Sequence, residues 1–118
     1  MFSVPEKNGK IRPIIDFSIL NKMLHIPSFK METVERISHS VEGRLYSTSV
    51  DITDAYLHVP INWEFHRFLA FVLGDRIFVF QVLPFGLSPA PWAFSKVMKP
   101  VKSLLWSEGI RVFSFLDD

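Results

Sequence analysis

Residues Tyr46–Ile61 read YSTSVDITDAYLHVPI, and this stretch decides the predicted fold. The run from Leu45 to Ile52 alternates in polarity and is rich in strand-forming side chains, a pattern that predicts a β-strand. Asp51 then lies at the end of that strand, and Asp54 follows in a predicted turn. A carboxylate at a strand end is held on rigid backbone and partly screened from water. It is therefore well placed to hold a divalent cation.

A second stretch of the same kind closes the chain. Val112–Leu116 reads as a short apolar strand, and Asp117 and Asp118 follow it directly. Two strand ends that are far apart in the sequence can meet side by side in one sheet. Three carboxylates, those of Asp51, Asp117 and Asp118, would then share one small volume. Like charges that close need cations, and Mg²⁺ with oxygen ligands satisfies this requirement.

Length and composition indicate one domain with a real core. The chain has 118 residues, of which 48% are hydrophobic and twelve are Phe, so we expect a heavily aromatic core. There is no Cys, which excludes disulfides and Cys-ligated zinc. The four His residues show no paired metal-ligand spacing. No apolar run is long enough to span a membrane and no signal peptide is recognisable, so we expect an intracellular protein, cytoplasmic or nuclear, without a membrane partner.

Charge gives only a weak indication of the partner. The net charge is +1, with seven Lys/Arg against five Asp/Glu in residues 1–44 and six against seven in the rest. A mildly basic first half and carboxylates at strand ends would suit a polyanion whose phosphates meet metal ions. The excess is too small to identify a nucleic-acid-binding protein by itself.

The first residues predict a hairpin. Val4 to Phe17 reads as two strands that reverse at Asn8-Gly9, and the basic side chains it carries are Lys7, Lys10 and Arg12. Two interpretations stay open here. One is a solvated basic hairpin, which composition alone favours. The other is a mobile lid over phosphates, with Arg supplying a planar fork and Lys a point charge.

The remaining chain predicts an α+β fold, a mostly antiparallel sheet with helices packed on one side. The helix from Ser88-Pro89 should end at Gly109, and Pro100 predicts a kink in it. The other predicted elements are an irregular segment 18–29, a helix 30–41, one helical turn 63–67, a hairpin of 68–73 and 77–82 around Gly74-Asp75, a loop 83–87 and a last strand 110–115.

Four segments, in this order, resemble the motifs of reverse transcriptases, the RNA-directed DNA polymerases of retroelements. Val4–Lys22 is similar to the fingers hairpin that holds the nucleotide, and Ser49–Tyr56 is similar to the first catalytic motif of the palm. Leu83–Phe94 is similar to the loop and helix beneath template and nucleotide, and Phe115–Asp118 is similar to the aromatic-x-Asp-Asp turn. In its detailed sequence, the chain is most similar to LTR-type and DIRS-type retrotransposon enzymes.

The resemblance implies a right-hand polymerase fold and a reaction. Residues 1–44 would be mainly fingers and residues 45–118 mainly palm, with a fingers-type hairpin near 68–82. The domain would add dNTPs to a primer 3′-hydroxyl on an RNA or DNA template by two-metal nucleotidyl transfer. The chain ends at Asp118, inside the catalytic hairpin and before a thumb, so we expect this partial fingers–palm unit to be inactive alone.

The resemblance also implies roles for single residues. Asp51, Asp117 and Asp118 would be catalytic and, with the Ile52 carbonyl, would hold two Mg²⁺ ions, for which Mn²⁺ could substitute. Tyr56 would lie against the deoxyribose and exclude a 2′-hydroxyl. The nucleotide-binding residues as a set would be Lys7, Lys10, Arg12, Asp54, Ala55, Tyr56, Phe85 and Gly86. Glu6 stands where relatives often have a basic residue, and Phe115 stands where Tyr is usual.

Plainer interpretations stay open beside these. Asp51 could simply end a strand, Asp54 could cap a turn and Tyr56 could belong to the core. The whole chain could be an inactive retroelement relic, a non-enzymatic RNA-binding fold, or a metal-dependent nuclease, because clustered Asp residues also serve hydrolysis. The sequence leaves the oligomeric state open.

Overall fold

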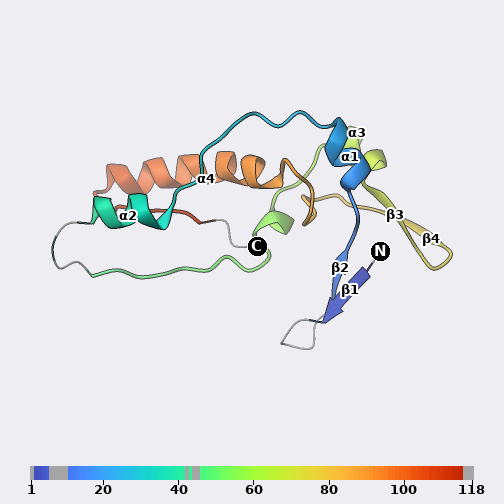
Figure 1. Ribbon diagram of the computed structural model, residues 1–118, viewed down its shortest axis with the longest axis horizontal. Coiled ribbons are helices and arrows are strands. Elements are labelled where there is room, and N and C mark those ends of the chain that lie inside the picture. The colour runs from blue at the N-terminus through green and yellow to red at the C-terminus, as the bar shows by residue number, and fades with distance from the viewer. Residues whose placement is uncertain (1, 6–10, 42, 44–45, 116–118) are drawn as a thin grey trace.

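Helices and two short hairpins make up the chain in the computed structural model, which describes residues 2–5, 11–41, 43 and 46–115, with the backbone alone for 2–5 and 11–13 (Figure 1). The elements, in order, are β1 (Phe2–Pro5), β2 (Ile11–Ile14), α1 (Ser18–Met23), α2 (Val34–Ser40), the 3₁₀ turn η1 (Ala55–His58), α3 (Trp63–His66), the 3₁₀ turn η2 (Arg67–Leu69), β3 (Ala70–Leu73), β4 (Arg76–Val79) and α4 (Ala90–Ser107). The α+β class predicted from the sequence is confirmed at this level.

The molecule is elongated. Its extents are 58 × 34 × 23 Å and its radius of gyration is 17.3 Å, against about 13.5 Å for a compact domain of this length. Helices α2 and α4 lie at one end, and the two hairpins lie at the other (Figure 1). A shape this open leaves many large apolar side chains exposed, among them Ile19, Trp63 and Leu104.

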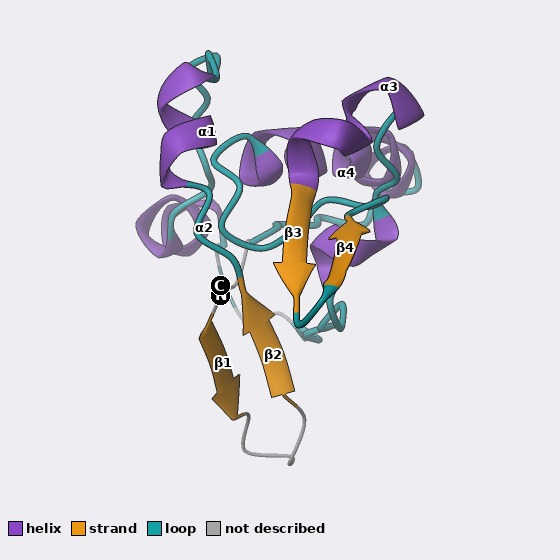
Figure 2. Cartoon of the chain, turned by 90° about the vertical axis from the view of Figure 1, so that its right-hand side faces the viewer, coloured by secondary structure: helices purple, strands orange, loops and turns teal. Residues whose placement is uncertain are grey.

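The predicted first hairpin is confirmed, although it is shorter than expected. Strand β1 pairs antiparallel with β2, from Phe2↔Ile14 to Pro5↔Ile11. Figure 2 shows this hairpin extending away from the helices. Strand β2 ends at Ile14 because the chain then turns Phe17 into the core, where it is buried. The Asn8-Gly9 turn lies outside the described residues.

The second hairpin forms around the predicted turn, but its strands are shorter than the predicted 68–73 and 77–82, because Arg67–Leu69 form η2 and β4 ends at Val79. Leu73 pairs with Arg76, so Gly74 and Asp75 form the two-residue turn. Gly74 has a φ of +61° whereas Asp75 does not have a positive φ, as a type II′ turn requires. Cross-strand packing adds to the turn, since the ring of Phe71 stacks on that of Phe78 at 5.7 Å between centroids.

Helix α4 ends where the sequence predicts. Gly109 has a φ of +80° and its N–H donates to the carbonyl of Trp106 at 3.0 Å, while the N–H of Ile110 donates to Leu105 at 2.9 Å. These two bonds form the glycine-dependent cap that terminates many helices. The start differs by one residue, because Pro89 rather than Ser88 occupies the N-cap position. None of the described helices is long and apolar enough to cross a membrane.

Two further predictions needed correction in the first half of the chain. Residues 18–29 are not wholly irregular, since α1 forms at Ser18–Met23. The predicted helix 30–41 begins only at Val34, because Thr33 is its N-cap and its hydroxyl accepts from the N–H of Arg36 at 3.4 Å. The residues before Thr33 stay outside the helix, and there Glu32 contacts a distant part of the chain.

The single sheet predicted from the sequence is wrong. The described part of the run 45–52 forms no strand, and neither does the described part of the final run, residues 110–115. A strand needs a neighbour to satisfy its backbone. Val50 is 82% exposed, so the alternating side chains of its run have no sheet face to pack on. Among the described residues, β1–β2 and β3–β4 are two separate sheets.

The core is small and forms where the ends of several elements meet. Phe17 follows β2, Tyr56 lies in η1, and Phe94 lies in the first turns of α4. Three of the buried apolar residues are aromatic, in agreement with the expected aromatic core, and the cluster comprises Phe17, Tyr56, Leu69, Leu83, Leu87, Ala90 and Phe94.

Candidate active site

Asp51 lies in an extended, exposed loop rather than at the end of a strand. The neighbouring Ile52 is 43% exposed, so this stretch is accessible to solvent and to ions. Asp117 and Asp118 lie outside the described residues, and the meeting of three carboxylates therefore stays a prediction. Within the described ranges, no three His, Asp or Glu side chains gather closely enough to hold a metal ion.

Asp54 begins a tight turn, as predicted. Its φ of 52° and ψ of 44° place it in the left-handed region, which Asp tolerates better than most residues. The carbonyl of Asp54 accepts from the N–H of Leu57 at 2.8 Å. The ring Nε2–H of His58 donates across the turn to the carbonyl of Thr53 at 3.1 Å. These bonds fix the backbone immediately after Asp51, including the N–H groups of Asp54 and Ala55.

Tyr56 connects two of the sequence motifs. It is only 8% exposed. Its ring centroid lies 5.3 Å from that of Phe85, in the loop before α4, and 5.8 Å from that of Phe94 in α4. The alternative that Tyr56 belongs to the core thus describes its position in the structure. Its predicted contact with a deoxyribose is untested and stays a prediction.

The loop before α4 is held from both sides. Leu83 and Leu87 are buried, and Gly86 has a φ of +85°. A Cβ atom added to Gly86 would lie 3.7 Å from the carbonyl oxygen of Ile15 and 3.9 Å from the ring of Phe17. The loop that carries the predicted nucleotide-binding pair Phe85-Gly86 therefore packs on the segment after the first hairpin.

Asn21 joins the same two segments and was missed at the sequence level as a site residue. Its side-chain Nδ2 donates to the carbonyl of Gly86 at 2.9 Å, and its Oδ1 accepts from the N–H of Ser88 at 2.8 Å. An Asn inside a helix is a mild signal of such a role, because Asn is a poor helix former that hydrogen-bonds readily to backbone.

The start of α1, which carries Asn21, is fixed by Asp16. Its carboxylate accepts from the hydroxyl of Ser18 and from the N–H of Ser18. These two bonds lower the pKa of Asp16 below the ordinary value of 3.8, and the bond from the hydroxyl has the larger effect. The exposed carboxylate is thus occupied in holding the helix start.

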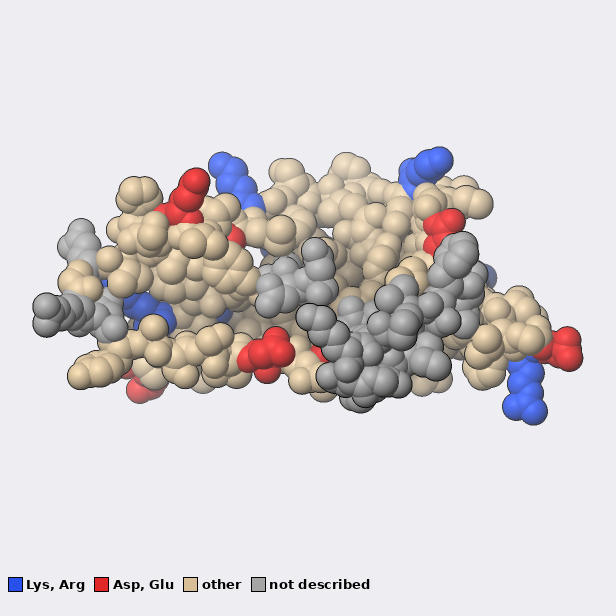
Figure 3. All heavy atoms as spheres, turned by 60° about the horizontal axis from the view of Figure 1, so that its bottom comes forward, with Lys and Arg blue, Asp and Glu red and all other residues tan. Residues whose placement is uncertain are grey.

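The predicted phosphate-gripping residues are only partly described. Arg12 lies in β2, for which the backbone alone is described, and Lys7 and Lys10 lie outside the described residues. On the face shown in Figure 3, Lys and Arg side chains are scattered among other residues rather than gathered in one stripe. Three of the four motif segments thus meet in the structure: residues 15–21, 54–56 and 83–94.

Comparison with known proteins identifies the family. The sequence model of the family described as "Reverse transcriptase (RNA-dependent DNA polymerase)" matches residues 4–118. The match covers nearly the whole chain and contains all four motif segments.

Two of the relatives that match the chain are much longer than it. The Transposon Tf2-3 polyprotein of Schizosaccharomyces pombe is 26% identical over 115 residues, which cover 98% of this chain. The protein K02A2.6 of Caenorhabditis elegans is 36% identical over 107 residues, which cover 89% of this chain. The chain spans only 8% of the length of each of these relatives. No solved structure matches it.

Proposed function

Because the chain belongs to the reverse transcriptase family of nucleotidyltransferases, we propose that it forms the fingers–palm part of such an enzyme. Residues 1–44 would be mainly fingers and residues 45–118 mainly palm. The β3–β4 hairpin, within residues 68–82, would belong to the fingers. The reaction is the template-directed addition of dNTPs to a primer 3′-hydroxyl, on an RNA or DNA template.

The observation that supports this most is the convergence of the motifs. Tyr56, two residues after Asp54, packs its ring on Phe85, and Asn21 bonds to the carbonyl of Gly86. Segments separated by 65 residues in the sequence therefore meet at the loop that would lie beneath the nucleotide. A polymerase site needs these three motifs close together, although an inactive relic with the same fold would keep the same contacts.

The family uses divalent metals, and the donor groups in this chain suit them. The proposed ligands are the carboxylates of Asp51, Asp117 and Asp118 and the carbonyl of Ile52, all of them oxygen donors, which Mg²⁺ prefers. Mn²⁺ would substitute, because it accepts the same donors. A pair of bound ions supplies charge neutralisation for the in-line displacement. Asp51 is exposed, as a ligand shared with a substrate must be.

The chain's own residues would bind and orient the nucleotide. The N–H groups of Asp54 and Ala55, fixed by the turn bonds, would contact the triphosphate together with Lys7, Lys10 and Arg12. Tyr56 would select dNTPs by crowding a 2′-hydroxyl. The ring of Tyr56 packs on two other rings and the residue is only 8% exposed, so the sugar would contact one fixed edge of the ring.

The test is templated primer extension with Mg²⁺, run on the 118-residue chain and on the polypeptide of its full reading frame. The 118-residue chain alone should show no extension. In the longer polypeptide, Asp51→Asn keeps the shape of the side chain but removes its charge, and should lower extension by about 10²–10³-fold or more, as the loss of a positioned electrostatic group does. Asp75→Asn is the matched control, since Asp75 is exposed in the β3–β4 turn. Its activity should not change.

Two outcomes would replace the proposal. Nucleic-acid binding that falls steeply with salt, shows no Mg²⁺ dependence and survives Asp51→Asn would indicate an RNA-binding fold. Strand cleavage without dNTPs would indicate a nuclease. Full extension by the Asp51→Asn protein would refute the assignment of Asp51 directly.

A further inference from the structure

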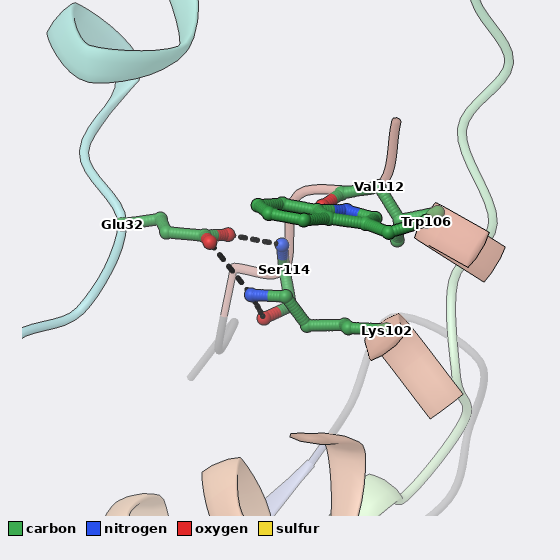
Figure 4. A network of polar contacts seen from close by, with 5 residues as sticks. All are labelled: Glu32, Lys102, Trp106, Val112 and Ser114. Carbon is green, nitrogen blue, oxygen red and sulfur yellow. Dashed lines mark hydrogen bonds and ion pairs between the residues drawn. The ribbon is translucent and has the colours of Figure 1, made fainter. Parts of the chain in front are cut away.

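A polar network joins Glu32 to α4 and to the segment that follows α4 (Figure 4). The carboxylate of Glu32 lies between α4 and the segment after it. Its Oε1 accepts from Nζ of Lys102 at 2.6 Å, and its Oε2 accepts from the N–H of Ser114 at 2.7 Å. Glu32 and Ser114 are 82 residues apart in the sequence. One carboxylate therefore binds a helix and a separate piece of backbone at the same time.

Helix α4 adds two bonds to the same segment. Nζ of Lys102 donates to the hydroxyl of Ser114 at 3.4 Å, and the indole Nε1–H of Trp106 donates to the carbonyl of Val112 at 3.2 Å. Lys102 and Trp106 are four residues apart and so lie on one face of the helix. Alternate residues of the segment, Val112 and Ser114, are thus each held by a side chain.

These bonds hold a segment that forms no strand. The described residues 110–115 pair with no strand, yet a backbone N–H and a carbonyl in this segment both have partners. The side chains of Lys102 and Glu32 are 21% and 25% exposed, so the ion pair is largely screened from water. Charge-assisted bonds in such surroundings are stronger than neutral or fully exposed ones.

We propose that Glu32 is a positioning residue for the reaction, with Lys102 and Trp106 as its supports. Its carboxylate fixes the backbone at Ser114, and the chain reaches Asp117 three residues later. The inference rests on the proposed function, because it gives Asp117 and Asp118 the metal-binding role. Glu32 itself contacts no reacting group and acts only through the backbone that it holds.

The direct test is amide hydrogen exchange in the 118-residue chain. Glu32→Ala removes both bonds and should speed exchange at Ser114 by about tenfold or more, the effect of losing one charge-assisted bond. The N–H groups of Leu57 and Ala93, bonded to Asp54 and Pro89, serve as internal references and should not change. Ser114→Ala, which loses only the longer hydroxyl bond, is the matched control, with little effect at position 114.

Graded variants separate the hydrogen bond from the charge. Lys102→Met removes the ion pair but leaves the bond from Ser114 to Glu32, so exchange at Ser114 should rise less than in Glu32→Ala. Glu32→Gln keeps one acceptor for Ser114, so its exchange rate at Ser114 should lie between those of Lys102→Met and Glu32→Ala. Unchanged exchange at Ser114 in Glu32→Ala would overturn the inference. Equal acceleration at Leu57 and Ala93 would overturn it as well, because Glu32 would then stabilise the whole fold and position nothing.

The kinetic readout uses the polypeptide of the full reading frame. Glu32→Ala should lower kcat for primer extension about tenfold, leave the KM for template–primer unchanged and raise the Mg²⁺ concentration needed for half-maximal rate. Lys99→Met, a neighbouring lysine of α4, should change none of these. Normal kinetics in Glu32→Ala, with Asp51→Asn inactive, would refute the positioning role alone. An active Asp51→Asn would refute the proposed function, whatever the exchange result.

Discussion

Asn21→Ala should loosen the loop before α4 without touching any residue of that loop. The side chain of Asn21 forms two hydrogen bonds to backbone, one to the carbonyl of Gly86 at 2.9 Å and one from the N–H of Ser88 at 2.8 Å. Alanine removes both bonds and leaves the helix propensity of α1 higher than before. Any loss of stability therefore comes from the two lost bonds and from the unsatisfied groups they leave.

The magnitude follows from the number and surroundings of these bonds. Each is worth about 1 kcal/mol net, and the half-buried setting of Asn21 lets water replace part of the loss. The expected destabilisation is about 1–2 kcal/mol. Asn21→Asp keeps an acceptor for Ser88 but faces a carboxylate oxygen toward the carbonyl of Gly86, so its loss should be at least as large. Lys22→Ala, on the exposed side of the same helix, is the control and should lie within about 0.5 kcal/mol of the unchanged protein.

Urea unfolding followed by tryptophan fluorescence measures the effect. With a slope of about 1.5 kcal/mol per M, a loss of 1.5 kcal/mol lowers the unfolding midpoint by about 1 M. An Asn21→Ala midpoint equal to that of Lys22→Ala would refute the reasoning, because the two bonds would then contribute nothing to folding. A changed slope would instead indicate that the substitution alters the unfolded or native surface.

Two further predictions concern the same region. Gly86→Ala should destabilise the protein by about 1–2 kcal/mol in the same urea assay, because a φ of +85° is strained for alanine. The cost comes from the backbone alone, since the nearest atoms leave ordinary room for a Cβ. An unchanged unfolding midpoint would contradict this. The pKa of Asp16, followed by NMR, should lie below 3.8 and rise toward that value in Ser18→Ala. Because the folded-state pKa is the lower one, the contribution of Asp16 to stability is complete above pH 3.8 and disappears as the pH falls through the folded pKa; an equal pKa in both proteins would contradict the role of Ser18.

The sequence predicted the features that depend on a few neighbouring residues. The β3–β4 turn needs only a positive φ at its first residue, and Gly74 supplies it. The end of α4 needs only a left-handed residue after the last turn, and Gly109 supplies it. Such signals are complete within four or five residues, so no knowledge of the rest of the fold is required.

Features that depend on distant partners could not be predicted in this way. The runs 45–52 and 110–115 have the composition of strands, but composition expresses a preference for a pleated, half-buried surface and does not supply a neighbouring strand. The bonds of Asn21 to Gly86 and of Glu32 to Ser114 span 65 and 82 residues. A Glu before a helix is ordinary, and an Asn inside one is only a mild signal that does not identify its partner.

The two halves of the candidate site are held by different forces. Apolar contact holds the half around Tyr56, whose ring packs on those of Phe85 and Phe94, and it depends on volume rather than on charge. Polar bonds hold the other half, where Glu32 and Lys102 bind Ser114 in a segment that forms no strand. The proposed metal site requires the carboxylates of Asp51 and Asp117 to approach one another. Because salt weakens ion pairs more than aromatic contacts, added salt should loosen the segment 112–114 before it loosens the packing around Tyr56.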